Sequence, residues 1–233
     1  MRPPEWEQFY ERILSDMGYS REEDEATVRI LKAVTTGSDL VDPDDLRPMF
    51  SDGATVFGDA PCLEDDIRSR PPLGPLVASG SAVRRLLALG IRPDAVVTDL
   101  DGDIDAQLEA SRSGAVTFIH AHGDNGELVR MHAGKFEGPV VLTTQSIPST
   151  TVFNFGGFTD GDRAVCIARE LGARSILLEG FDFEHPNPKE GSDPAVKLRK
   201  LAWAREIIAS VGGVETLRPM LRAFRIQPWC FVL

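Results

Sequence analysis

One stretch of the sequence shows the pattern that decides the fold: AVVTDLDGDIDAQLEASR, residues 95–112. Its first four residues are apolar or β-branched, as in a strand that is buried on both faces, and an acidic turn containing Gly102 follows. From Ile104 to Ser111 the sequence favours a helix. A buried strand, a polar turn and a helix in succession are typical of the βαβ units of a parallel sheet.

The same pattern recurs along most of the chain. The predicted strands are the short apolar runs Ala54–Phe57, Leu76–Ala78, Ala95–Thr98, Val116–Ile119, Val140–Thr143 and Ser175–Leu178. The predicted helices are Leu63–Arg70, Ala82–Leu89, Ile104–Ser111, Gly126–His132, Asp162–Leu171 and Pro194–Ser210. Because strands without polar alternation must be covered on both faces, the sequence predicts an α/β fold with a doubly wound, mostly parallel sheet.

The two ends of the chain differ from this pattern. Apolar residues recur at helical spacing over Trp6–Met17, and a capping box at Ser20–Glu23 precedes a second helix. The sequence therefore predicts a small N-terminal helical appendage over residues 1–50 and an α/β catalytic domain over residues 51–233. For the tail, residues 214–233, an edge strand and a packing arm are both compatible with the sequence.

Composition limits the class of protein and its partners. The 233 residues are 42% hydrophobic and 26% charged, which is typical of a globular protein whose core needs no disulfides. A net charge of −11 argues against nucleic acid or an anionic membrane as partner, so an anionic ligand must be held locally. The three cysteines are far apart, the N-terminus is polar, and no apolar run approaches the roughly 20 residues of a membrane span. We expect a cytoplasmic protein with small-molecule substrates, and a homo-oligomer is left open.

Polar residues follow the predicted strands at the edge of the sheet where such folds bind ligands. Among them, Asp99, Asp101 and Asp103 alternate along the chain and project to one side of an extended segment. Carboxylates forced together repel one another unless a hard cation such as Mg²⁺ neutralises them. The alternative is an acidic turn in which an aspartate caps the helix that begins near Ile104.

Two histidines follow the next strand. His120 and His122 alternate and are followed by Asp124 and Asn125, but no third nitrogen or thiolate ligand is adjacent, so zinc is disfavoured. A hydrogen bond or a positive charge offered to phosphate is one interpretation, with Asp124 or Asn125 near a metal. A buried histidine followed by an Asp-Asn helix cap is the other, and the sequence does not separate them.

Glycines and acidic residues are combined in NFGGFTDGDRA, residues 154–164. Gly156-Gly157 lets the backbone approach a ligand, and the N–H groups of the following helix can bind an anion. Asp160 and Asp162 repel phosphate, so they must cap the helix, bind a metal or act as a base, while Arg163 can bind phosphate. Gly58 and Gly80 after the first two strands give weaker signals of the same kind.

Aromatic and basic residues offer further contacts. Phe153, Phe155 and Phe158 can stack on a flat heterocycle, although aromatic residues beside a strand are more often part of the core. Lys197 and Lys200 lie on one side of the last predicted helix, for which a solvated face is the default expectation.

Four strings together resemble a known family. VTDLDG (97–102), HAHGDN (120–125), TTQ (143–145) and NFGGFTDGDRA (154–164) are similar to those of the archaeal MptE-like 6-hydroxymethyl-7,8-dihydropterin pyrophosphokinases, over roughly residues 54–201. A more distant likeness joins Asp99-Leu100-Asp101 to the Gly-Asp-Phe-Asp-Ser motif of thiamin pyrophosphokinases.

The resemblance implies an enzyme that moves the terminal diphosphate of ATP to the hydroxymethyl oxygen of a reduced pterin, with Mg²⁺, in methanopterin or folate biosynthesis. The implied metal ligands are Asp99, Asp101, Asp103 and Asp162, and the implied catalytic residues are Asp99, Asp101, Asp124 and His122. The implied contacts to nucleotide or pterin are Gly58, Gly80, His120, Asn125, Thr144, Gln145, Asn154, Gly156, Gly157, Asp160 and Arg163.

The chain departs from the family at two turns. After the first strand it has Asp59-Ala60-Pro61-Cys62-Leu63 where the family tends to carry Gly-Pro-Ser-Leu. After the second it has Ala78-Ser79-Gly80-Ser81-Ala82 where the family tends to carry Ala-Asp-Gly-Ala. An acidic group is gained at one strand end and lost at the next. These two altered turns keep a non-catalytic nucleotide-binding domain as an alternative. A thiamin pyrophosphokinase-like transferase, which shares the donor and the metal and differs in the acceptor, is the other alternative.

Overall fold

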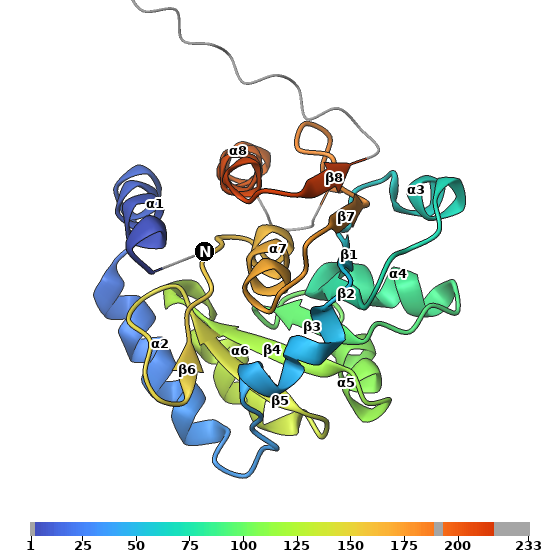
Figure 1. The fold of residues 1–233 in the computed structure, drawn as a ribbon. Coiled ribbons are helices and arrows are strands. Elements are labelled where there is room, and N and C mark those ends of the chain that lie inside the picture. Colours follow the sequence, from blue (N-terminus) through green and yellow to red (C-terminus); the bar gives the residue numbers. More distant parts are fainter. Residues whose placement is uncertain (1–2, 189–192, 217–233) are drawn as a thin grey trace, which may run out of the picture.

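The structure, a computed structural model, describes residues 3–188 and 193–216. Over these residues it contains one eight-stranded sheet in the order β6-β5-β4-β3-β2-β1-β7-β8, in which every neighbouring pair is parallel (Figure 1). The strands are β1 (Ala54–Phe57), β2 (Leu76–Ser79), β3 (Ala95–Thr98), β4 (Val116–Ala121), β5 (Val140–Thr144), β6 (Val152–Phe153), β7 (Ile176–Glu179) and β8 (Val214–Thr216). The chain moves outward from β1 to β6 and then returns to the other side of β1, so the predicted doubly wound parallel sheet is confirmed.

Helices cover both faces of the sheet (Figure 1). One face carries α1 (Pro3–Met17), α7 (Asp160–Glu170) and α8 (Pro194–Ser210). The other carries α2 (Arg21–Val34), α3 (Leu63–Ser69), α4 (Val83–Ala88), α5 (Ile104–Arg112) and α6 (Gly126–His132). A 3-10 segment, η1 (Pro43–Phe50), leads into β1.

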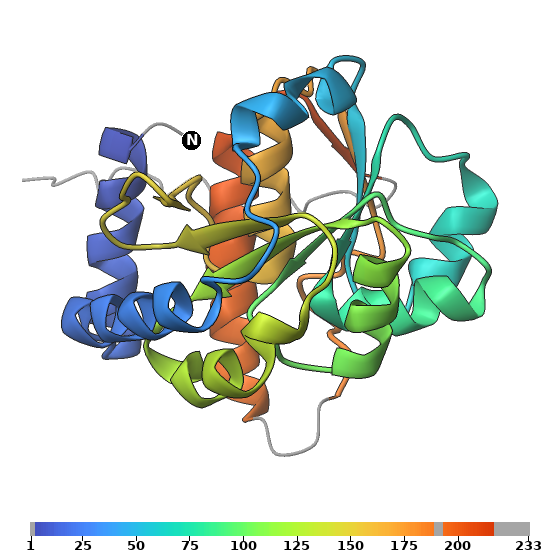
Figure 2. The same cartoon turned by 90° about the horizontal axis from the view of Figure 1, so that it is seen from below.

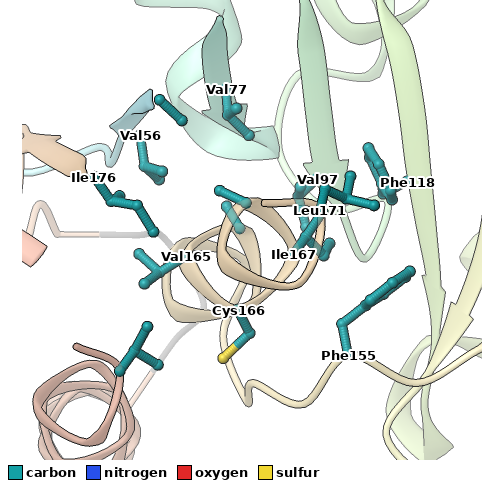
Figure 3. Close-up of a cluster of buried hydrophobic side chains, with 14 of the residues drawn as sticks. Val56, Val77, Val97, Phe118, Phe155, Val165, Cys166, Ile167, Leu171 and Ile176 are labelled. Atoms are coloured by element: carbon teal, nitrogen blue, oxygen red, sulfur yellow. The ribbon is translucent and has the colours of Figure 1, made fainter. Parts of the chain in front are cut away.

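Helix α7 lies at the centre of the larger core. Val56, Val77, Val97 and Phe118, from four adjacent strands, point toward this helix (Figure 3). Alternate residues of each strand point to opposite faces of the sheet. On the face that α7 covers, residues 162–168 of this helix are all buried. Helix α8 covers the outer side of α7, and the two helices run side by side (Figure 2). Within the buried run 162–168, Asp162 and Arg163 are charged and have hydrogen-bond partners at the start of the helix, and the rest, residues 164–168, is apolar.

The two N-terminal helices wrap around the β5–β6 edge of the sheet (Figure 2). Gly18, with φ at 71°, ends α1 in the left-handed conformation that favours glycine. Ser20 then caps α2 by accepting a hydrogen bond from the N–H of Glu23, as the capping-box pattern predicts. Because α1 packs on the face of α7 and α2 on the opposite face, the turn between them, which contains Tyr19, is placed beside the sheet edge.

The predicted elements agree with the structure to within a few residues. Five of the described elements were not predicted: β6, which is two residues long, and the 3-10 segments η1, η2 (Gly80–Ala82), η3 (Gly123–Asn125) and η4 (Ala133–Lys135). The β8 strand lies at the end of the sheet, so the edge-strand alternative for the tail is confirmed over residues 214–216. The remainder of that prediction, residues 217–233, lies outside the described residues. None of the described helices is both long and apolar enough to cross a membrane.

Candidate active site

A large cavity lies at the carboxyl edge of the sheet. Its volume is about 1340 Å³, whereas about 300–1,000 Å³ is usual for one small ligand. Residues that follow β1, β2, β3, β4 and β7 line it, together with the start of α7 and one side of α8. This is the edge where parallel sheets bind ligands, and the volume is sufficient for two substrates.

A strained turn brings two carboxylates to this cavity. Between Asp99 and Asp101, Leu100 is fully buried and has φ at 67°, in the left-handed region that side chains other than glycine rarely adopt. The N–H of Leu100 donates to Thr98 Oγ1 at 2.8 Å, and that of Asp101 donates to Asp99 Oδ1 at 3.2 Å. Such strain costs about 1–2 kcal/mol and is common at functional sites. Here it buries Leu100 while both flanking aspartates line the cavity.

Gln107 of α5 holds this turn in place. Its Nε2 donates to the carbonyl of Asp101 at 2.8 Å, and its Oε1 accepts from Thr98 Oγ1 at 2.8 Å. Gly80 packs against the same group, because a Cβ at this position would lie 2.6 Å from Thr98 Oγ1. Gly80 therefore has a packing role, and its neighbour Ser79 lines the cavity.

A third carboxylate joins the first two from α7. Oxygen atoms of Asp99, Asp101 and Asp160 all lie within 4.8 Å of one another. Burial, then the charge of Asp99, raises the pKa of Asp160 well above its usual value. Arg163, 3.0 Å away, offsets this in part. An all-oxygen set of acidic ligands suits a hard divalent cation such as Mg²⁺, so the residues fit the metal that the sequence analysis expected.

The structure gives the two other expected metal ligands different contacts. Asp162 is fully buried, and its carboxylate accepts hydrogen bonds from the N–H groups of Phe158 and Thr159 at 2.6 and 2.8 Å, which caps α7. Asp103 borders the cavity, but its carboxylate accepts from the N–H of Ala106 at 3.0 Å and caps α5. Asp160, expected as a ligand contact, takes the third place in the cluster. The structure therefore brings Asp99, Asp101 and Asp160 together and gives Asp103 and Asp162 helix-capping contacts, while the metal site itself stays a prediction.

Of the two histidines, only His122 lines the cavity. Its Nε2 lies 3.5 Å from Asp99 Oδ2, and its Nδ1 accepts from the N–H of Asp124 at 3.3 Å. Burial alone raises the pKa of Asp99, but the hydrogen bond and charge of His122, with Arg163, bring it below its usual range. The carboxylate of Asp124 is exposed on the cavity.

His120 and Asn125 hold the loop instead. His120 is buried, its Nδ1 lies 3.0 Å from Thr143 Oγ1, and burial, then Arg163, lowers its pKa well below the usual value. A neutral, buried histidine offers no charge to phosphate. Asn125 donates from Nδ2 to the carbonyls of Asp99 and His120 at 2.8 and 2.7 Å. Neither residue borders the cavity.

The Gly-Gly stretch before α7 also packs internally. Gly157 has φ at 96°, and a Cβ there would lie 2.4 Å from Arg163 Cα. The Arg163 side chain is only 3% exposed, and it donates to Asp160 and to the carbonyl of Phe158 at 2.9 Å. Asn154 accepts from the N–H of Gly156 at 2.9 Å. The start of α7 is therefore shaped by residues that do not border the cavity, namely Asn154, Gly156, Gly157 and Arg163.

The residues that were expected to contact a ligand at the ends of β1 and β5 differ in their positions. Gly58 lines it, and a Cβ there would lie 2.5 Å from the carbonyl oxygen of Gly180. Gln145 lines it as well, whereas Thr144 is buried and accepts from the N–H of Ser146 at 3.1 Å.

The acidic group gained after β1 is paired with an arginine. Arg85 of α4 donates to Asp59 Oδ1 at 2.9 Å and also binds Glu64. Its guanidinium reaches the carbonyls of Asp59 and Ala60 as well. Asp59 therefore shares the one positive charge of Arg85 with Glu64.

Several cavity residues differ from the sequence expectation. Lys197 and Lys200 line the cavity, although a solvated face was the default, and Phe158 lines it while Phe153 and Phe155 pack in the core. The sequence analysis missed two further residues, Tyr19, which lines the cavity, and Asp24, which is buried beside it. Asp24 could have been noticed, because it is an acidic residue at a position of the apolar stripe of α2. No local pattern in the sequence marks Tyr19.

Fold and site together define a class: an α/β protein with a carboxylate cluster in a large cavity at the carboxyl edge of a parallel sheet. The chain belongs to the MptE-like family, because residues 29–188 match the family model described as 6-hydroxymethylpterin diphosphokinase MptE-like.

Three similar proteins carry the name 6-hydroxymethyl-7,8-dihydropterin pyrophosphokinase. The one from Pyrococcus furiosus is 42% identical over 89% of this chain and 93% of its own length. The one from Methanothermobacter thermautotrophicus is 38% identical over 87% and 92%, respectively. The one from Methanocaldococcus jannaschii is 31% identical over 88% and 93%.

Proposed function

We propose that this protein is a 6-hydroxymethyl-7,8-dihydropterin pyrophosphokinase that uses ATP as donor and releases AMP. The names of the three relatives support the pyrophosphokinase class. The observation that carries the proposal is the cluster of Asp99, Asp101 and Asp160 inside a cavity large enough for two substrates. The product, a pterin diphosphate, is an activated intermediate of the kind that methanopterin or folate biosynthesis consumes.

The reaction requires attack of the pterin hydroxyl oxygen on the β-phosphorus of ATP. A bond forms between these atoms, the bond from the β-phosphorus to the bridging oxygen of the α-phosphate breaks, and AMP leaves with that oxygen. The hydroxyl proton is lost in the same reaction. Catalysis of such transfers is mainly alignment and charge stabilisation.

The described residues divide these tasks. Asp99, Asp101 and Asp160 would hold Mg²⁺, which, when bound, neutralises charge on the phosphate oxygens. His122 has both ring nitrogens engaged, Nε2 toward Asp99 and Nδ1 toward Asp124 N–H, so it orients Asp99 rather than accepting a proton. The exposed carboxylate of Asp124 fits the role of general base better. Lys197 and Lys200 of α8 line the cavity and add positive charge.

One incubation tests the proposal. The full chain is mixed with ATP, Mg²⁺ and 6-hydroxymethyl-7,8-dihydropterin, with thiamine and no acceptor as parallel arms. We expect AMP and the pterin diphosphate in equal amounts, and no ADP. If AMP forms with thiamine and not with the pterin, the acceptor is thiamine. Formation of ADP would indicate a simple kinase. If no AMP forms with either acceptor, the protein is a non-catalytic nucleotide-binding protein.

A further inference from the structure

The two N-terminal helices contribute directly to one end of the cavity. Tyr19, in the turn between α1 and α2, faces Phe158, and the two ring centroids lie 6.3 Å apart. Lys200 Nζ lies 5.6 and 5.8 Å from the two rings. All three side chains line the cavity. They form an aromatic wall suited to a flat heterocycle, and we call this region the Tyr19 end.

Both helices also fix Gln145 at this end. Trp6 of α1 donates from Nε1 to the carbonyl oxygen of Gln145 at 2.7 Å, and Asp24 of α2 accepts from Gln145 Nε2 at 2.9 Å. Asp24 is buried and also accepts from the Tyr10 hydroxyl at 2.5 Å and from the N–H of Gly123 at 2.7 Å. Trp6 thus holds the main-chain carbonyl of Gln145, and Asp24 holds its side-chain amino group. The side chain of Gln145 also contacts His120. Gln145 lines the cavity, and its side-chain oxygen Oε1 can accept a hydrogen bond from an N–H donor.

The groups that line the two ends differ. Glu23 and Asp24 border a small recess that adjoins the Tyr19 end, and Asp124 lines both spaces. These three acidic groups outnumber the one ammonium group of Lys200 there, which disfavours a polyphosphate at this end. On the β2 side of the carboxylate cluster, Ser79 Oγ is buried and has no hydrogen-bond partner among the described residues, and Arg84 lines the cavity nearby. Hydroxyl and guanidinium donors suit phosphate oxygens.

We infer that the acceptor pterin binds at the Tyr19 end, with its ring against Tyr19 and Phe158 and its N–H edge toward Gln145, which Asp24 positions. The ATP phosphates then extend from the carboxylate cluster toward Ser79. His122 connects the two regions, since it borders the Tyr19 end and lies 3.5 Å from Asp99. The inference rests on the proposed function for the identity of the acceptor.

Binding measurements on the full chain test this assignment independently of turnover. Calorimetry with Mg²⁺ gives one dissociation constant for a non-hydrolysable ATP analogue, and a second for 6-hydroxymethyl-7,8-dihydropterin in its presence. Tyr19→Leu and Gln145→Leu should each weaken pterin binding about tenfold, equivalent to about 1.4 kcal/mol for one ring contact or hydrogen bond. Binding of the analogue should change less than about twofold.

Phe9→Leu is the matched control. Phe9 is a half-buried aromatic residue of α1 that stacks on Trp6 and does not line the cavity. We expect this variant to lose stability and to bind both ligands normally. The inference is overturned if Tyr19→Leu weakens binding of the ATP analogue and not binding of the pterin, or if it changes the binding of neither ligand. It is also overturned if the wild-type protein does not bind the pterin. If the wild-type protein binds the pterin, Tyr19→Leu weakens that binding and no AMP is ever formed, the subsite stands and the proposed activity fails.

The positioning role of Asp24 has its own readout. Asp24→Asn keeps the size of the side chain, but its single oxygen cannot replace both carboxylate oxygens as acceptors for Gln145, Tyr10 and Gly123. Pterin binding should weaken in this variant, and adding Asp24→Asn to Gln145→Leu should cause no further loss. Additive losses in the double variant would show that Asp24 affects pterin binding independently of Gln145, and would overturn its positioning role.

Discussion

Asp101→Asn and Asp103→Asn form a matched pair, because the two aspartates are two residues apart on one loop and differ in their contacts. Asp101 belongs to the carboxylate cluster, whereas Asp103 caps α5. Two charges no more than 4.8 Å apart repel by at least about 3 kcal/mol at an effective dielectric constant of about 20. Without a cation, Asp101→Asn should therefore be at least as stable as the wild-type protein. Asn caps a helix about as well as Asp, so Asp103→Asn should also keep its stability.

Adding Mg²⁺ should increase the unfolding free energy of the two variants by different amounts. At a concentration about 100 times its dissociation constant, a ligand stabilises the folded state by about 2.7 kcal/mol. We expect the wild-type protein and Asp103→Asn to gain such an increment in chemical unfolding, and Asp101→Asn to gain less than about 1 kcal/mol and to lose at least about 100-fold in turnover. The reasoning is refuted if Asp101→Asn keeps the full Mg²⁺ increment, or if Asp103→Asn loses it to the same extent.

Two further predictions concern the surrounding structure. Burial raises the pKa of Glu179 from 4.5 to about 7, so the stability from its protonated form is complete below about pH 4.5 and is lost as pH rises through 7. The unfolding free energy of the wild-type protein, relative to Glu179→Gln, should fall by about 2 kcal/mol over this window; a flat difference would contradict the assignment. Gly157→Ala places a Cβ 2.4 Å from Arg163 Cα at a φ of 96° and should cost at least about 2 kcal/mol in urea unfolding; wild-type stability would show that this loop shifts freely.

Much of the fold was predictable because the buried strands are short apolar runs bounded by polar turns. Val116–Ala121 and Ala95–Thr98 are examples in which local composition and burial agree. The β6 strand was missed because two residues, Val152 and Phe153, carry no periodicity. The segment η1 was missed because its prolines mark a loop in sequence, and its packing on the core depends on distant residues.

Two members of the carboxylate cluster were predictable and the third was not. Asp99 and Asp101 are two residues apart in sequence, so local reasoning places them together. Asp160 reaches them only through the return of the chain from β6 to α7. The pattern from Thr159 to Asp162 has the form of a capping box, and it could have assigned Asp162 to the helix start and left Asp160 for the cluster.

The contribution of the N-terminal helices was beyond local reasoning. Tyr19 lies between two amphipathic helices, and its position in the cavity depends on how α1 and α2 pass around the sheet edge. Gln145, by contrast, follows a predicted strand, so its place at the carboxyl edge could be predicted. Its partner Asp24 could not, because the contact joins segments 121 residues apart.

The central claim is that Asp99, Asp101 and Asp160 bind one divalent cation that also contacts the nucleotide phosphates. A crystal structure with Mn²⁺ and a non-hydrolysable ATP analogue, with anomalous diffraction at the manganese edge, tests it most directly. We expect one strong anomalous peak about 2.1–2.2 Å from an oxygen of at least two of the three carboxylates and from phosphate oxygens. A fully bound analogue with no anomalous peak among these residues would contradict the account.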